Sequence, residues 1–84
     1  MKPIFFNLAI ENDEYDARNR VYVANYTKGK QFAVFINREQ TIIVTPAEKT
    51  DQACRVRFGG ADGAFLVYGR LSEILGHISE HMGW

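Results

Sequence analysis

The feature that most constrains the fold is a change of hydrophobic period near the C-terminal end of the chain. Residues 64–68 are five apolar or aromatic residues with glycines on either side, which predicts a buried strand. From residue 70 onward, the apolar positions recur at helical spacing. The side chains predicted to share one helix face are Leu71, Ile74, Leu75, Ile78 and Met82. Because a single short helix is marginal in water, this face requires a surface supplied by the rest of the chain.

The N-terminal segment has the period of a strand. Residues 4–11 alternate between larger apolar side chains and others, which predicts a strand with its even-numbered positions facing inward. The polar stretch that follows, residues 11–19, is predicted to be a loop with room for one helical turn around Tyr15. It is not a calcium-binding loop, because it lacks the central glycine and the closing glutamate that such a loop needs.

Two β-rich runs, residues 20–27 and 31–37, flank Lys28 and Gly29 and predict a hairpin. A type I′ turn suits this loop, although Lys28 as well as Gly29 then needs positive φ. The resulting register pairs Val23 with Val34 and separates two faces. The face expected in the core carries Val21, Val23, Phe32, Val34 and Ile36. The opposite face is aromatic and edged by charge, with Arg20, Tyr22, Ala24, Tyr26, Ala33 and Phe35.

The middle of the chain predicts two further strands. Residues 38–40 are a turn before a strand over 41–45. A loop of two residues would place Ile42 and Val44 together on one face of the sheet, and a loop of three residues would place them on the other, so both alternatives stay open. Residues 45–48 have the form of a helix capping box, but polar residues follow, so at most one helical turn is expected. Residues 53–58 alternate as a fifth strand, and residues 59–63 form a glycine-rich link.

These elements predict an α+β fold: an antiparallel sheet of five or six short strands with the C-terminal helix packed on one face. Eighty-four residues suffice for a single domain, residues 1–84, with one core. One helix is too narrow for a flat sheet of this width. We therefore expect the sheet to curl around the helix, or its other face to be partly wet, or a partner or second copy to cover it.

Charge and cysteine content limit the class of protein. Ten Lys and Arg balance ten Asp and Glu, which argues against a general nucleic-acid binder. Cys54 is the one cysteine, so no internal disulfide forms and a reducing compartment is favoured. The N-terminal residues do not resemble a signal peptide, and no apolar stretch approaches the roughly 20 residues of a membrane span. We therefore expect a cytoplasmic protein that does not associate with membranes.

No set of residues predicts catalysis or metal binding. His77 and His81 have the i,i+4 spacing of a metal pair, but no third ligand accompanies them, and histidines suit a helix C-terminus. Cys54 lies in phase with Val56 and Phe58, which favours a buried core residue over a nucleophile. We expect a protein that is not an enzyme and needs no metal or cofactor.

Partner binding is the hypothesis that the surface residues favour. Basic and aromatic side chains interleave around the expected hairpin, and an acidic run precedes it. The predicted partner-binding residues are Arg20, Tyr22, Tyr26, Lys28, Lys30, Phe35, Asp13, Glu14 and Asp16. Tyrosine and arginine are typical of protein–protein contacts. The alternative is a nucleic-acid-binding module that uses the basic and aromatic face of the hairpin over residues 20–38.

In size, composition and expected architecture, the whole chain resembles the short accessory proteins of temperate bacteriophages, including small anti-CRISPR and anti-restriction proteins. The resemblance depends on no motif, so it assigns no role to any residue. It implies action by binding, in which the protein covers a working surface of a host defence or replication complex. A homodimer is compatible with this expectation, because pairing of edge strands or burial of an open sheet face would enlarge a small core.

Overall fold

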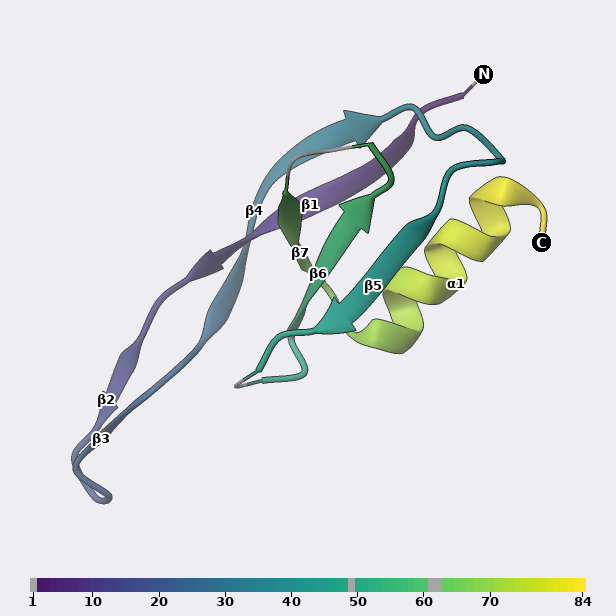
Figure 1. Ribbon diagram of the computed structural model, residues 1–84. Coiled ribbons are helices and arrows are strands. Elements are labelled where there is room, and N and C mark those ends of the chain that lie inside the picture. The colour runs from purple at the N-terminus through teal and green to yellow at the C-terminus, as the bar shows by residue number, and fades with distance from the viewer. Residues whose placement is uncertain (1, 49, 61–62) are drawn as a thin grey trace.

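The computed structural model describes residues 2–48, 50–60 and 63–84, which adopt the predicted α+β fold (Figure 1). The elements are β1 (Ile4–Glu11), β2 (Glu14–Asp16), β3 (Val21–Val23), β4 (Tyr26–Val34), β5 (Ile42–Pro46), β6 (Ala53–Phe58), β7 (Ala64–Tyr68) and α1 (Leu71–Met82). Five antiparallel strands form the main sheet in the order β4-β1-β7-β6-β5. β2 and β3 form a separate two-stranded sheet, and α1 packs on one face of the main sheet.

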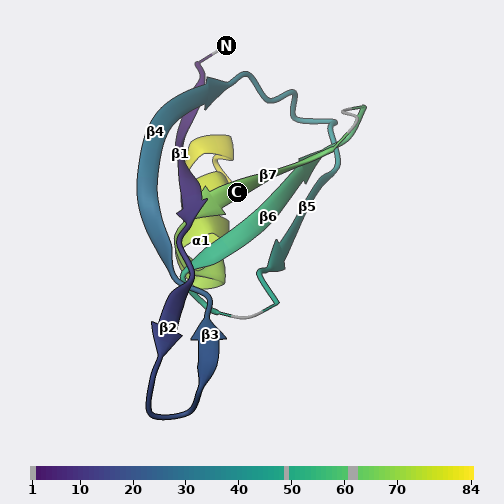
Figure 2. The same cartoon turned by 90° about the vertical axis from the view of Figure 1, so that its left-hand side faces the viewer.

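The main sheet has two halves that meet along a narrow seam. β4 pairs with β1 from one end of β1 to the other, and β6 pairs along its length with both β5 and β7. Between β1 and β7, in contrast, the register pair within the described residues is Leu8 with Val67. Figure 2 shows β4 and β1 on one side of α1, and β5, β6 and β7 on the other. Curling of the sheet therefore allows a single helix to cover it.

The hydrophobic core lies between the concave face of this curled sheet and α1. Both halves of the sheet contribute to it, so it closes the seam from inside. Its buried members are Ile4, Phe6, Ile36, Cys54, Val56, Phe58, Val67, Ile74, Ile78 and Met82. Burying large aliphatic or aromatic side chains of this kind contributes about 1.5–3 kcal/mol each before the loss of chain entropy.

Four phenylalanine rings bridge the seam. The ring centroid of Phe6 on β1 lies 5.8 Å from that of Phe32 on β4 and 6.4 Å from that of Phe58 on β6. Phe65 on β7 completes the circuit, at 5.2 Å from Phe32 and 6.1 Å from Phe58. Tilted pairs at such distances stabilise by about 0.5–1.5 kcal/mol each beyond the area they bury. We call these four residues the phenylalanine cluster. Its contacts between Phe6 and Phe58 and between Phe32 and Phe65 join the two halves of the sheet, which share few backbone hydrogen bonds.

The predicted hairpin around Lys28 and Gly29 is wrong. Both residues lie within β4, which runs without a turn from Tyr26 to Val34 and pairs with β1 instead of with residues 20–27. A register shift between Asn7 and Ala9 of β1 marks an irregularity at this point of the ladder. Gly29 serves close packing here, because a Cβ on it would lie 2.9 Å from the Leu8 carbonyl oxygen. Pairing with β1 also places Phe32 opposite Phe6, and a local hairpin would not bring them together.

Several predicted core positions are exposed. Val21 and Val23 were expected inside, but they lie in β3, which pairs with β2 away from the core. Residues 14–16, expected in a loop or helical turn, form β2. The prediction that even-numbered residues of β1 face the core is correct for Ile4 and Phe6, which are buried. It is wrong for Leu8 and Ile10, which are exposed. The C-terminal half of β1 extends beyond the helix (Figure 1), so no second layer covers it.

The later strands follow the predictions more closely. β6 is the expected fifth strand, with Cys54, Val56 and Phe58 buried. Ile42 and Val44 pair with Phe58 and Val56 and pack against the core, which settles their common face. The capping box over 45–48 starts no helix in the described residues: β5 continues to Pro46, and Lys49 lies outside them. In the link over 59–63, Ala61 and Asp62 lie outside the described residues.

Two details of the C-terminal prediction differ. β7 lies inside the sheet, between β1 and β6, yet Val67 is its one buried side chain, since Phe65 and Tyr68 remain partly exposed. On α1, Ile74, Ile78 and Met82 are buried and Leu71 packs beside them. Leu75 is 48% exposed because it lies at the edge of the apolar stripe, outside the curl of the sheet.

Both ends of α1 have identifiable backbone contacts. The Arg70 carbonyl accepts the Ile74 amide at 2.9 Å at the start of the helix. At its end, Gly83 has φ 74°, and the Gly83 and Trp84 amides donate to the carbonyls of Glu80 and Ser79, which is a Schellman motif. With twelve residues α1 is short, and no helix in the described part of the chain has both the length and the apolar character to cross a membrane.

Two glycine substitutions are predicted to change stability in opposite directions. Gly29→Ala places a Cβ against the Leu8 carbonyl oxygen and Ile10, so we expect the free energy of unfolding to fall by about 1–3 kcal/mol. Gly76→Ala is the matched control, because its Cβ meets nothing within 4 Å in the middle of α1. It is expected to stabilise by about 0.5–1 kcal/mol. Urea denaturation measures both, and equal effects of the two variants would contradict the close packing of β4 on β1.

Candidate partner-binding surface

A hairpin arm extends from the core and gives the molecule its elongated shape. We define the arm as residues 12–25, which contain β2 and β3 (Figure 1). The principal extents of the molecule are 49 × 20 × 19 Å and its radius of gyration is 14.4 Å. A compact chain of this length would have a radius of about 12 Å. The arm is therefore a projection from the core.

The base of the arm is anchored where it leaves the sheet. The Asn12 amide donates to the Asn25 carbonyl at 2.7 Å, and the Asn25 side-chain amide donates to Glu14 Oε1 at 3.3 Å. The next residue, Tyr26, is buried in a small cluster with Ala47 and Ala53. Its amide donates to Gln52 Oε1 at 3.2 Å. The arm therefore starts from an ordered root.

Asp16 organises the turn at the tip of the arm. Its Oδ1 accepts the backbone amides of Arg18 and Asn19, at 3.0 and 3.4 Å, and its Oδ2 accepts the Asn19 side-chain amide at 2.8 Å. Arg20 completes the loop in the left-handed region, with φ 54°. Hydrogen bonds from the Asn19 side chain and then from the Asn19 backbone amide lower the pKa of the Asp16 carboxyl. Desolvation opposes this shift, and the Arg18 amide adds to it.

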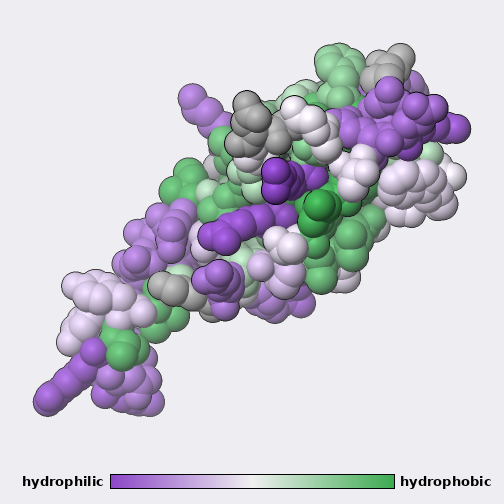
Figure 3. All heavy atoms as spheres, viewed as in Figure 1, coloured by the Kyte–Doolittle hydropathy of each residue, from purple (hydrophilic) through white to green (hydrophobic). Residues whose placement is uncertain are grey.

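The arm presents two different faces. Tyr15 and Tyr22 pair directly across the strands, with ring centroids 5.1 Å apart, and are 56% and 74% exposed. The other register pairs, Glu14 with Val23 and Asp16 with Val21, belong to the opposite face. Figure 3 shows apolar and hydrophilic side chains side by side along this projection. One face is therefore aromatic, and the other combines carboxylates with exposed valines.

The structure divides the predicted partner-binding residues into two groups. The arm carries Arg20, Tyr22, Asp13, Glu14 and Asp16. Lys28 and Lys30 are exposed on β4, and Phe35 is 65% exposed just after it. Tyr26 was expected on the exposed aromatic face, but it is buried at the root of the arm. The continuous basic and aromatic face expected over residues 20–38 does not form, because β3 and β4 do not pair with each other.

Sequence reasoning missed Tyr15 as a surface residue. A signal for this hairpin is present in the sequence. Residues 14–16 and 21–23 alternate as strands do, and Asp16 and Asn19 are turn formers between them. Sequence reasoning also missed the pair of exposed arginines, Arg55 and Arg57, on the outer face of β6. Their alternation with buried residues predicts exposure but does not predict a role.

His77 and Cys54 each contact a backbone carbonyl within the fold. His77 Nε2 donates to the Phe5 carbonyl oxygen at 2.7 Å, and its ring meets Phe6 edge-on at 5.5 Å, which joins α1 to β1. Among the described residues, no three His, Cys, Asp or Glu side chains come together to hold a metal. Cys54 is buried with its Sγ 3.5 Å from the Gly69 carbonyl oxygen, and burial raises the pKa of its thiol. A raised pKa disfavours the reactive thiolate.

Comparisons of the chain with protein-family models, with curated proteins and with solved structures find no match.

Removal of the Asp16 carboxylate is predicted to loosen the tip without unfolding the core. In Asp16→Ala the Arg18 and Asn19 amides lose their acceptor, so we expect faster hydrogen exchange at these two amides, measured by NMR. Because the folded pKa lies below the unfolded one, the contribution of Asp16 is present above its ordinary pKa of about 4 and is lost as the pH falls through the folded pKa. Acidification should therefore lower the protection factors of the same two amides in the wild type, once the slower intrinsic exchange at low pH is divided out.

Asp13→Ala provides the control, because Asp13 accepts no hydrogen bond within the described residues and lies outside the turn. Its exchange pattern is expected to match that of the wild type. Equal exchange at Arg18 and Asn19 in both variants would contradict the role of Asp16.

Proposed function

We propose that the protein is a non-enzymatic binding protein that contacts a larger protein through its arm. The observation that carries this proposal is the exposed pair of Tyr15 and Tyr22 on a projection that contributes no buried side chain to the main core. A two-stranded hairpin is marginally stable alone in water, and three or more strands or a packed helix are usually needed. Contact with a partner would bury the tyrosines, which are frequent energetic centres of protein interfaces.

The charge distribution on the arm supports a polar and specific contact. Asp13, Glu14 and Asp16 lie along β2 and at its start, whereas Arg18 and Arg20 lie in the turn region. Separate acidic and basic patches give complementarity that selects the partner and sets the orientation of docking. A partner whose groove encloses the arm would bury Tyr15 and Tyr22 on one side and place basic groups against Glu14 and Asp16 on the other.

The biological setting of this proposal is inhibition of a host defence or replication complex, as implied by the resemblance to short accessory proteins of temperate bacteriophages. The cytoplasm is the proposed compartment, since Cys54 is a free buried thiol. Inhibition would follow from occupation of a working surface on the partner, and the protein itself would perform no chemistry.

Nucleic-acid binding is the alternative function. It is favoured by Lys28 on β4 and by Arg55 and Arg57 on β6, which the strand register places on the outer, convex face of the sheet. Phosphate contacts of this kind weaken steeply as salt rises, because bound counterions are released on association. The two functions therefore use different surfaces and differ in their dependence on salt.

Photo-crosslinking is expected to place the partner on the arm. A benzoylphenylalanine introduced at position 22 should capture one protein from a nuclease-treated bacterial lysate at moderate salt. The same group at position 43, also exposed but on β5, is the control and should capture none. A parallel sample of the lysate is left without nuclease. Crosslinking to nucleic acid from position 43 in that sample, lost as salt rises, would overturn the proposal in favour of the alternative.

Truncation of the arm tyrosines is predicted to weaken binding of the captured protein. Tyr22→Ala should weaken binding by at least about 2 kcal/mol, roughly a 30-fold rise in Kd, as for a central interface residue. Ile43→Ala serves as a control at another exposed apolar side chain, and its Kd should stay within about twofold of the wild type. Titration calorimetry measures both values, and equal Kd values for the two variants would contradict a contact through the arm.

A further inference from the structure

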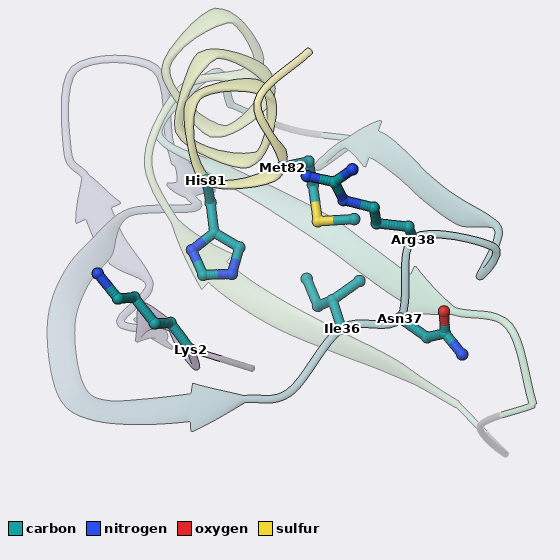
Figure 4. Close-up of a pocket in the computed structure, with 6 residues that line it drawn as sticks. All are labelled: Lys2, Ile36, Asn37, Arg38, His81 and Met82. Atoms are coloured by element: carbon teal, nitrogen blue, oxygen red, sulfur yellow. The ribbon is translucent and has the colours of Figure 1, made fainter.

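A hollow of about 520 Å³ opens at the end of the molecule opposite the arm. It lies between the segment before β1, the loop after β4 and the last turn of α1 (Figure 4). Its volume falls within the range of about 300–1,000 Å³ that is typical of small-molecule sites. The residues that line it are Lys2, Ile36, Asn37, Arg38, His81 and Met82.

The floor of the hollow is apolar. Ile36 and Met82 are 3% and 5% exposed and belong to the hydrophobic core. Figure 4 shows them between Lys2 and His81 on one side and Asn37 and Arg38 on the other. The Asn37 side chain is less available to a ligand, because its oxygen already accepts the Glu39 amide at 3.2 Å within the same turn. A ligand in the hollow therefore meets an apolar surface flanked by basic groups.

The walls of the hollow favour negative charge. Lys2 and Arg38 carry positive charges, His81 adds a third nitrogen group, and no described carboxylate residue lines the hollow. In the described part of the chain the one ion pair joins Arg70 and Asp51, so Lys2 and Arg38 form no salt bridge with a described carboxylate. The three polar groups come from three separate segments, and the fold brings them together.

The end of α1 opposes an anion only weakly. A helix C-terminus carries about half an elementary negative charge, against two full positive charges on Lys2 and Arg38. The carbonyls of Ser79 and Glu80 already accept the Trp84 and Gly83 amides, so they are satisfied within the helix cap. The end of the helix therefore offsets only part of the positive charge of Lys2 and Arg38.

We infer that this hollow binds a small organic anion. Its phosphate or carboxylate group would accept hydrogen bonds from Arg38, Lys2 and His81, and its apolar part would cover Ile36 and Met82. Arginine is suited to this role because its planar fork matches both kinds of anion. The site lies away from the arm, so it is independent of the proposed function.

Titration of the full ¹⁵N-labelled chain with phenyl phosphate and with benzoate tests the inference. At least one of these probes is expected to cause saturable shifts in the amides of residues 36–38 and 81–83. Inorganic phosphate, without the apolar part, and phenol, without the charge, should each bind at least about tenfold more weakly. The comparison of phenyl phosphate with benzoate identifies which anionic group the site prefers.

Variants separate a built site from general charge attraction. Arg38→Gln and Lys2→Gln should each raise the Kd of the preferred probe about tenfold, and Arg57→Gln, which removes an exposed charge on β6, should leave it unchanged. Thermal unfolding checks that each variant is folded. The inference is overturned by the absence of saturable shifts, by equal binding of phenol or inorganic phosphate, or by the same loss in Arg57→Gln as in Arg38→Gln.

Discussion

The fold depends on the phenylalanine cluster that bridges the two halves of the main sheet. β1 and β7 share one register pair within the described residues, so backbone hydrogen bonds alone hold the halves together weakly. Phe6, Phe32, Phe58 and Phe65 supply the missing contact, one ring from each of four strands. His77 extends this arrangement to α1 through the Phe5 carbonyl and the edge of Phe6. The narrow seam also permits the curl that lets one helix cover five strands.

In this arrangement, most residues that stabilise the core lie apart from the proposed contact surfaces. The core uses the concave face of the sheet, so the arm and the outer face remain free for contact. Tyr26 links the two parts, because its burial with Ala47 and Ala53 orders the base from which the arm extends. At the opposite end, Ile36 and Met82 serve both as core residues and as the floor of the basic hollow. The two proposed contact regions are thus attached to one small core without sharing residues.

Sequence patterns predicted the parts of the fold in which local period and burial agree. The stripe of α1 and the alternation of Cys54, Val56 and Phe58 are such cases, because both reflect a single packed face. The hairpin at Lys28 and Gly29 failed because a glycine required for close approach to Leu8 resembles a turn glycine in the sequence. The choice of β1 as the partner of β4 depends on the contact of Phe6 with Phe32, whose positions lie far apart in the chain.

The candidate site was predicted only in part, because strand pairing between distant residues determines it. Tyr22, Glu14 and Asp16 were identified by residue type, but their grouping on an arm depends on strand pairing that no local pattern determines. Val21 and Val23 have the alternation of core residues, and the arm exposes them because no second layer reaches it. The hollow at Lys2, Arg38 and His81 joins three distant segments, so only the assembled fold reveals it.

The central claim is that the arm is a structurally independent projection from a self-sufficient core. Replacement of residues 13–24 by Asn-Gly tests it directly, because the hydrogen-bonded Asn12 and Asn25 are suitably placed for a two-residue turn. Urea denaturation of this shortened chain is expected to give a free energy of unfolding within about 1 kcal/mol of the wild type. A chain that no longer folds, or a loss well beyond that value, would show that the arm is part of the core's stability and would contradict the account.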